Sequence, residues 1–133
     1  MDSQKLIDTA QALVVKSKGI LAADESGGTI KRRFDSINVE STEDNRRDYR
    51  EMLFRTEGVS DYISGVILFD ETIKQNGADG TPIVKVLLDR GIIPGIKVDK
   101  GTQALPGSPS ELVTEGLDGL RARLEEYASL GAG

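Results

Sequence analysis

Three short apolar runs, separated by stretches of helical periodicity, dominate the pattern of hydrophobic and polar positions along this chain. The runs cover residues 20–23, 62–69 and 92–98, and the second is rich in the β-branched and aromatic side chains that favour strands. Between the runs, apolar residues recur three and four positions apart, as in helices with one buried face. Strands joined by helical crossovers pair in parallel through right-handed connections. The pattern therefore predicts an α/β protein in which one helix precedes three strand–helix units.

Each predicted helix has a face that is expected to pack inward. The expected inward positions are Leu6, Ala10, Leu13 and Val14; Ile30, Phe34 and Ile37; Tyr49, Met52 and Leu53; Val84, Leu87 and Leu88; and Leu117, Leu120, Leu124 and Tyr127, with Tyr62 interpreted as a further packing residue. Asp2 or Ser3 can cap the first helix, and residues 41–44 form a second N-terminal cap signal. Pro82 is expected at the first position of another helix, which Gly91 closes.

The end of the chain carries fewer structural signals. Residues 101–116 contain Pro106 and Pro109 and are predicted to form a long loop. The sequence stops at residues 131–133, where another strand is expected. Three parallel strands leave two open edges and cannot close a barrel. Residues 1–133 are therefore interpreted as a single incomplete domain.

Composition and charge narrow the chemistry. The 133 residues are 38% hydrophobic and carry a net charge of −5, which argues against a general nucleic-acid or anionic-membrane surface. No apolar run approaches the roughly 18 residues of a membrane span, and the N-terminus lacks the features of a signal peptide, so a cytoplasmic location is expected. The chain contains no Cys and no His, which excludes thiolate catalysis and removes the commonest general base and metal ligand.

Charged residues end two of the apolar strands, and burying such charges is costly unless they pair or bind a ligand. Asp24 follows the first strand, and Lys97 and Asp99 share one face at the end of the third. If the sheet curls, Asp24 can meet Lys97 and form a polar floor for a hydroxylated ligand. The alternatives are a structural ion pair or a turn capped by Asp24. From the residues alone, Lys97 is more readily a positive charge for phosphate than a Schiff-base nucleophile.

A second candidate site is the turn at residues 26–29, which precedes a helix. Ser26, two glycines and Thr29 let the backbone approach an anion, and Arg33 follows within the first turns. The alternative is an ordinary capped helix with solvated arginines. No dinucleotide-binding or P-loop motif is present. Elsewhere, Arg46, Arg47 and Arg50 are interpreted as a solvated helix face or as partners of acidic neighbours, and Asp70 and Glu71 are polar residues after the second strand that could project into a site.

Several segments together resemble the class I fructose-bisphosphate aldolase family. The matching segments, in the order of the family, are residues 18–26, 43–47, 65–72, 95–101 and 115–120. The resemblance implies an eight-stranded (β/α)8 TIM barrel, of which this chain would be the N-terminal part, with about three βα units preceded by a helix. The family cleaves fructose 1,6-bisphosphate reversibly into dihydroxyacetone phosphate and glyceraldehyde 3-phosphate through a lysine Schiff base. It needs no metal or other cofactor and often assembles as a homo-oligomer.

The resemblance also implies roles for individual residues. Asp24 would orient the substrate hydroxyls, and Lys97 would support the charge network and a phosphate. Ser26 and Thr29 would lie near a substrate phosphate, and Arg33 would contact substrate. Thr29 replaces an expected serine, and Asp70 stands where animal-type relatives have histidine.

The lysine that forms the Schiff base lies on a later strand of the family's barrel, so these residues alone are expected to be inactive. The alternative function is a non-catalytic sugar-phosphate-binding or assembly module built from a partial barrel. In either case the expected partner is a sugar phosphate rather than a nucleic acid or a membrane.

Overall fold

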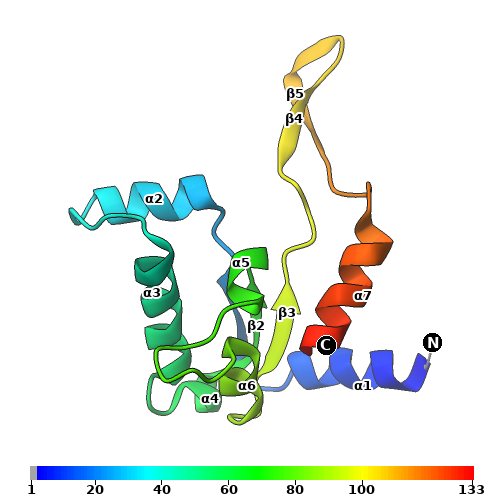
Figure 1. Cartoon of the computed structure of the whole chain (residues 1–133). Coiled ribbons are helices and arrows are strands. Elements are labelled where there is room, and N and C mark those ends of the chain that lie inside the picture. Colours follow the sequence, from blue (N-terminus) through cyan, green and yellow to red (C-terminus); the bar gives the residue numbers. More distant parts are fainter. Residues whose placement is uncertain (1–2) are drawn as a thin grey trace.

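The computed structural model describes residues 3–133. These residues form an α/β fold with parallel strands, as predicted (Figure 1). Its elements are α1 (Ser3–Leu13), β1 (Gly19–Ala23), α2 (Gly27–Asp35), α3 (Glu43–Arg55), α4 (Val59–Tyr62), β2 (Ile63–Leu68), α5 (Asp70–Ile73), α6 (Ile83–Leu88), β3 (Ile93–Ile96), β4 (Thr102–Leu105), β5 (Ser108–Thr114) and α7 (Leu120–Leu130). The alternative cap residue Asp2 lies outside the described residues. None of the helices in this described part is long and apolar enough to cross a membrane.

The three parallel strands lie in the order β1-β2-β3, so β2 is central. In the register of the sheet, Ala23 pairs with Leu68 and Leu68 pairs with Ile96. The three strands therefore end at the same level. The residues that follow them emerge along one edge of the sheet, which is where α/β proteins place their chemistry.

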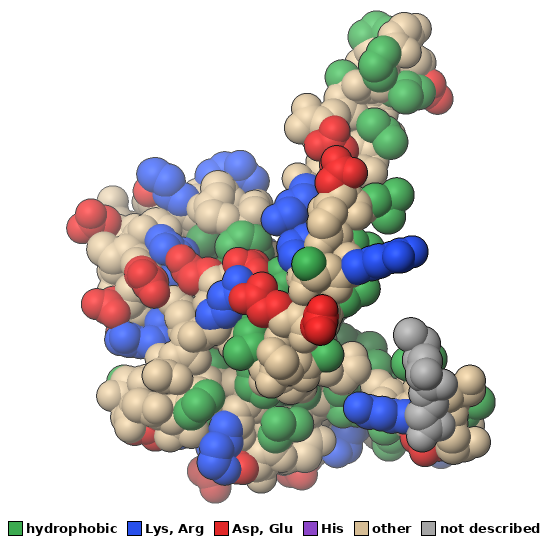
Figure 2. Space-filling view, turned by 45° about the vertical axis from the view of Figure 1, so that its right-hand side comes forward, with side chains coloured by type: hydrophobic (Ala, Val, Ile, Leu, Met, Phe, Trp, Pro, Cys, Tyr) green, Lys and Arg blue, Asp and Glu red, His purple; other side chains and the backbone are tan. Residues whose placement is uncertain are grey.

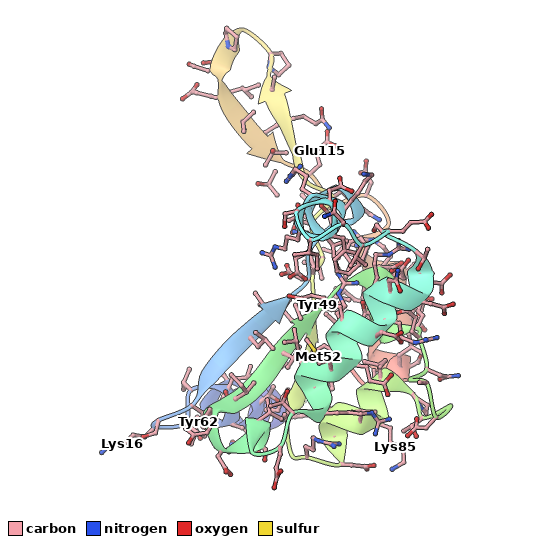
Figure 3. All side chains as sticks on the ribbon, turned by 90° about the vertical axis from the view of Figure 1, so that its left-hand side faces the viewer. Lys16, Tyr49, Met52, Tyr62, Lys85 and Glu115 are labelled. Carbon is pink, nitrogen blue, oxygen red and sulfur yellow. The ribbon has the colours of Figure 1, made fainter. Side chains whose placement is uncertain are left out.

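The core lies where β2 meets the helices that cover it. Leu68 on β2, Phe54 on α3, Leu87 on α6 and Tyr127 on α7 are all almost completely buried. Figure 3 shows α3 running alongside the sheet. The cap of α3 is as predicted, because the Thr42 hydroxyl accepts a hydrogen bond of 3.1 Å from the backbone N–H of Asn45.

Several predicted packing residues prove to be exposed. They are Leu6, Ala10, Val14, Ile37, Met52, Tyr62, Leu88, Leu117 and Leu124. The strand β1 does not bury both of its faces, because Ile20 is half exposed. No residue of α1 is buried: Leu13 lies against Gly65 of β2, but Leu6 and Val14 remain exposed. On α3 the buried positions are Arg50, Glu51 and Phe54. Of the predicted inward residues, Leu53 packs against the core and Tyr49 is partly buried, whereas the prediction for Met52 is wrong.

Residues 101–116 are not a loop, and this is the largest error in the predicted elements. β4 and β5 form an antiparallel hairpin in which Thr102 pairs with Thr114. Pro106 and Gly107 form its tip, and the φ of Gly107 is 81°, a left-handed conformation that glycine adopts without strain. The prolines are tolerated because an isolated hairpin has only edge strands. The hairpin projects away from the rest of the molecule (Figure 1).

Candidate active site

A cavity of about 470 Å³ lies at the edge of the sheet where the strands end. Its lining residues are Ser26, Phe69, Asp70, Lys97, Asp99, Lys100, Gly101, Arg123 and Tyr127. They come from the ends of all three strands and from α7. Figure 2 shows acidic and basic side chains gathered beneath the foot of the hairpin. These distant parts of the chain come together because the three strands end side by side in the sheet.

The centre of the site is Lys97 between two carboxylates. Its ammonium group donates a hydrogen bond to Asp99 Oδ2 and lies 4.0 Å from Asp24 Oδ2. The predicted meeting of Asp24 and Lys97 is therefore present in the structure. The hydrogen bond from Lys97, followed by one of 2.9 Å from the Gly101 backbone N–H, holds the pKa of Asp99 below its ordinary value. All three side chains keep partial contact with solvent, so the group can present one cation and two anions to a hydroxylated ligand.

The turn at residues 26–29 begins α2, and its outer side is open. Ser26 caps the helix through its backbone, because its carbonyl accepts hydrogen bonds from the N–H groups of Thr29 at 2.9 Å and Ile30 at 3.0 Å. The hydroxyl oxygens of Ser26 and Thr29 lie 3.2 Å apart. Ser26 lines the cavity with Lys97, whereas Thr29 and Arg33 lie outside its lining. Arg33 instead pairs with Glu25 and is largely exposed.

The interpretation of Arg50 as a solvated residue is wrong, since its side chain is completely buried. It donates hydrogen bonds of 2.7 Å to the Thr72 hydroxyl and to the Glu25 backbone carbonyl. Burial lowers the pKa of Arg50, although the nearby carboxylates of Glu25 and Glu71 partly oppose this. The acceptors lie more than 20 residues away along the chain. No local spacing in the sequence could therefore have identified these contacts.

The two neighbouring arginines behave differently from Arg50. Arg47 pairs with Asp44 and Asp48 on its own helix, as predicted. Arg46 instead binds Glu71 with both ends of its guanidinium, at 2.8 Å and 2.6 Å. This hydrogen bonding is the main reason that the pKa of Glu71 lies below its ordinary value.

Asp70 lines the cavity and is bound by two side chains. The Tyr127 hydroxyl donates to it at 2.7 Å, and the Lys74 ammonium lies 3.0 Å away. Burial alone would raise the pKa of Asp70, but these hydrogen bonds outweigh burial and the pKa is lowered. Tyr127 was predicted only as a packing residue, and its hydroxyl contact gives it a second role in fixing one wall of the cavity.

The remaining lining groups were not predicted from the sequence. Arg123 on α7 donates to the backbone carbonyls of Val98 at 3.0 Å and Gly116 at 2.6 Å, which ties the foot of the hairpin to the helix. Within the described chain there is no group of three or more Asp and Glu side chains placed to hold a metal ion. The available chemistry is that of ammonium, guanidinium, carboxylate and hydroxyl groups.

Comparison with known proteins identifies the family. The family model for fructose-bisphosphate aldolase class-I matches residues 5–133. A probable fructose-bisphosphate aldolase class 1 of Xanthomonas campestris pv. campestris is 63% identical over 132 residues, which is 99% of this chain and 40% of the relative. Fructose-bisphosphate aldolase 2 of Plasmodium berghei is 54% identical over 130 residues, covering 98% of this chain and 35% of that protein.

A solved structure has the same fold. Fructose-bisphosphate aldolase from Plasmodium falciparum, crystallised with TRAP and a small-molecule inhibitor, superimposes with a TM-score of 0.95 at 52% identity. The match covers 98% of this chain and 38% of the Plasmodium chain. This chain thus spans about 40% of the length of the curated relatives it matches. It belongs to the class I fructose-bisphosphate aldolase family.

Proposed function

We propose that this chain forms the substrate-orienting part of a Schiff-base aldolase. The reaction is the reversible cleavage of fructose 1,6-bisphosphate into dihydroxyacetone phosphate and glyceraldehyde 3-phosphate. The observation that carries the proposal is the position of Lys97 between Asp24 and Asp99 at the carboxyl edge of three parallel strands. In barrel enzymes this edge is where catalytic residues gather.

The proposal treats residues 1–133 as a single incomplete domain, the first three βα units of an eight-stranded barrel. Two observations support it. The strands β1, β2 and β3 are parallel, and β1 and β3 lie at the open edges of their sheet. The close superposition on an aldolase chain also covers only 38% of that chain. The complete protein is proposed to act in the cytoplasm as a homo-oligomer.

Each candidate residue has a role in this proposal. Asp24 accepts hydrogen bonds from substrate hydroxyls, and Lys97 stabilises negative charge that develops during cleavage. Ser26 and Thr29 donate to a substrate phosphate at the start of α2. Arg33 is largely exposed beside this turn and can bind phosphate with two of its N–H groups.

Lys97 does not replace the Schiff-base lysine of the family in this proposal. Its contacts with two carboxylates suit a charge-stabilising ammonium group rather than a nucleophilic amine. Residues 1–133 alone are therefore expected to be inactive. Borohydride reduction in the presence of fructose 1,6-bisphosphate, followed by mass spectrometry, should leave the chain unlabelled. Stoichiometric labelling of Lys97 would overturn this part of the proposal.

Turnover can be measured in a chimera with the Xanthomonas campestris relative, in which these residues replace the 40% that they match. The chimera should cleave fructose 1,6-bisphosphate, and Lys97→Met should lower kcat/KM by about 100-fold or more. Lys85→Met is the matched control, because Lys85 is an exposed lysine on α6 that pairs with Asp89. An inactive chimera that folds normally, or equal effects of the two substitutions, would contradict the proposed function.

A second candidate function is a non-catalytic sugar-phosphate-binding or assembly module. It is favoured by the fact that the cavity, with Ser26 and Lys97, is formed entirely by the described residues. Calorimetric titration of the chain with fructose 1,6-bisphosphate and with fructose distinguishes the two functions. Phosphate-dependent binding together with an inactive chimera would favour the binding module.

A further inference from the structure

We infer that Arg50 is a positioning residue that fixes the two strand ends bordering the active-site cavity. This inference rests on the proposed function for its catalytic consequence, but its structural part stands on contacts within the chain. Arg50 touches none of the candidate substrate-binding groups. It acts through the backbone beside Asp24 and Ser26 and through the start of α5.

The contacts of Arg50 connect the two segments that follow β1 and β2, beyond the last paired residues Ala23 and Leu68. One guanidinium nitrogen donates at 2.7 Å to the carbonyl of Glu25, the residue between Asp24 and Ser26. Another donates at 2.7 Å to the hydroxyl of Thr72 on α5, the helix that begins at Asp70. Asp70 and Ser26 both line the cavity. A single rigid group from α3 therefore sets the spacing of the two cavity walls.

The environment of Arg50 makes this spacing well defined. Arg50 and Thr72 have no exposed surface, and the guanidinium lies 5.7 Å from the centre of the Phe69 ring. A guanidinium holds its donors in a planar fork, so it fixes both the distance and the direction of its two acceptors. A lysine at the same position could not reproduce this geometry.

The Arg50 guanidinium also supports Arg33, the candidate phosphate-binding residue, through the carboxylate of Glu25. The Glu25 side chain is almost completely buried, with one oxygen paired to Arg33 and the other 3.6 Å from Arg50. The Arg50 charge thus helps to hold the carboxylate that holds Arg33. Glu25 Oε2 and Arg50 Nε have no hydrogen-bond partner in the described chain. Burying unpaired polar atoms lowers the stability of the fold. A buried charged group is weak evidence for stability, so a role in positioning accounts better for its presence.

The first test measures amide hydrogen exchange in the chain itself. Arg50→Lys and Thr72→Val should speed exchange at Thr29 and Ile30, whose N–H groups bond to the Ser26 carbonyl, by about tenfold. Exchange at the Lys97 amide, which bonds to Leu68 in the sheet, should stay unchanged. Arg55→Met is the control, because Arg55 lies on the same helix but pairs with Glu51 and Asp79.

The outcomes of this test are decisive in both directions. Faster exchange confined to the turn in the Arg50 and Thr72 variants supports positioning. Uniform acceleration over turn and sheet, or an equal effect of Arg55→Met on the turn, shows a merely structural role and overturns the inference. Both variants keep a positive charge at position 50. The test therefore does not need a variant without that charge, such as Arg50→Met, to fold.

The second test measures turnover in the Xanthomonas chimera. Arg50→Lys should lower kcat/KM for fructose 1,6-bisphosphate by about 100-fold, because small misplacements of reacting groups are costly. Part of the loss should appear as a higher KM, because the turn at residues 26–29, which is proposed to bind a substrate phosphate, is displaced together with Asp24. Arg55→Met should leave both constants nearly unchanged.

If Arg50→Lys changes kcat/KM less than about threefold in an active chimera, the catalytic consequence fails. If the wild-type chimera is inactive, the proposed function fails, while the exchange measurements still decide whether Arg50 fixes the turn.

Discussion

The three-stranded sheet and the β4–β5 hairpin both consist of short strands, but their surroundings are opposite. On the central strand β2, Val66 and Leu68 are almost completely buried beneath helices. Every residue of β4 is exposed, as is every residue of β5 except its first. The comparison shows that a segment can extend without the apolar pattern of a buried strand, as β4 and β5 do by pairing with each other. The elements that cover the strand then decide whether it contributes to a core.

The charged side chains of the two regions also have different surroundings. At the edge of the sheet, α3 brings Arg50 close to the Glu25 carboxylate, and the chain after β3 places Lys97 against Asp99. On the hairpin, Glu111 contacts only the nearby Ser108 among the hydrogen bonds of the described chain. Charge that several elements hold in one place can orient a ligand. Charge on an isolated ribbon stays exposed to solvent.

The largest effect that separates the two regions is expected from Leu87→Ala. Leu87 on α6 has no exposed surface and belongs to the same core cluster as Val66 and Leu68 of β2. Truncation leaves a cavity and should cost about 2–5 kcal/mol of unfolding free energy. Urea unfolding followed by circular dichroism measures the loss. A cost below about 1 kcal/mol would mean that the sheet is no better packed than the hairpin.

A smaller but still clear loss is expected from Gly65→Ala in β2. A Cβ at this position would overlap the Leu13 side chain and lie 3.2 Å from the Ile93 carbonyl oxygen. The resulting strain should cost about 1–3 kcal/mol in the same unfolding measurement. Gly28→Ala on α2 is the control, because nothing lies within 4 Å of a Cβ built there. Equal effects at the two glycines would contradict the close packing of α1 on β2.

The next effect concerns pH. Because hydrogen bonding to Arg46 lowers the pKa of Glu71 in the folded state, the folded protein binds this proton less readily than the unfolded chain. The resulting stabilisation is present above the unfolded glutamate pKa of about 4.3 and is lost as the pH falls through and below that value. Glu71→Gln should therefore cost about 0.5–1 kcal/mol at pH 7, with the difference from wild type shrinking in acid.

Unfolding at neutral and at acidic pH measures this difference, with Glu57→Gln, on the exposed segment after α3, as the control. A gap between wild type and Glu71→Gln that is constant across the pH range would show that the Arg46 contact is not the cause.

The smallest effect is expected from Leu112→Ser on β5. Leu112 is one of the exposed hydrophobic residues of the hairpin, so it loses little contact when truncated. The change in unfolding free energy should stay within about 0.5 kcal/mol. A loss comparable to that of Leu87→Ala would show that the hairpin is packed against something after all.

The sequence was sufficient to predict the parts of the fold that depend on local pattern. The three strands, their parallel pairing and the helix cap within residues 41–44 all follow from periodicity and turn residues. The hairpin was missed because Pro106 and Pro109 suggest a loop. Local pattern does not reveal that the chain on either side of the Pro106–Gly107 tip pairs with itself.

The candidate site was predictable from the sequence where it depends on the ends of the strands, but not where it depends on contacts between distant elements. Asp24 and Lys97 could be placed together, because strand ends in a parallel sheet meet at one edge. Arg50 could not be placed, since an arginine among arginines on a charged helix looks solvated. Its burial is possible only because Glu25 and Glu71 come from other elements. Contacts of this kind depend on tertiary packing, and a single sequence does not display them.

The turn between β4 and β5 has a practical consequence. Since Pro106 and Gly107 stand at the tip of a ribbon that projects from the body, extra peptide added between them would lengthen the ribbon without pushing on the sheet. An epitope or a fluorescent reporter could be carried there. Arg123 anchors the other end of the ribbon at Val98 and Gly116, so such a passenger would leave the arrangement around Lys97 as it is.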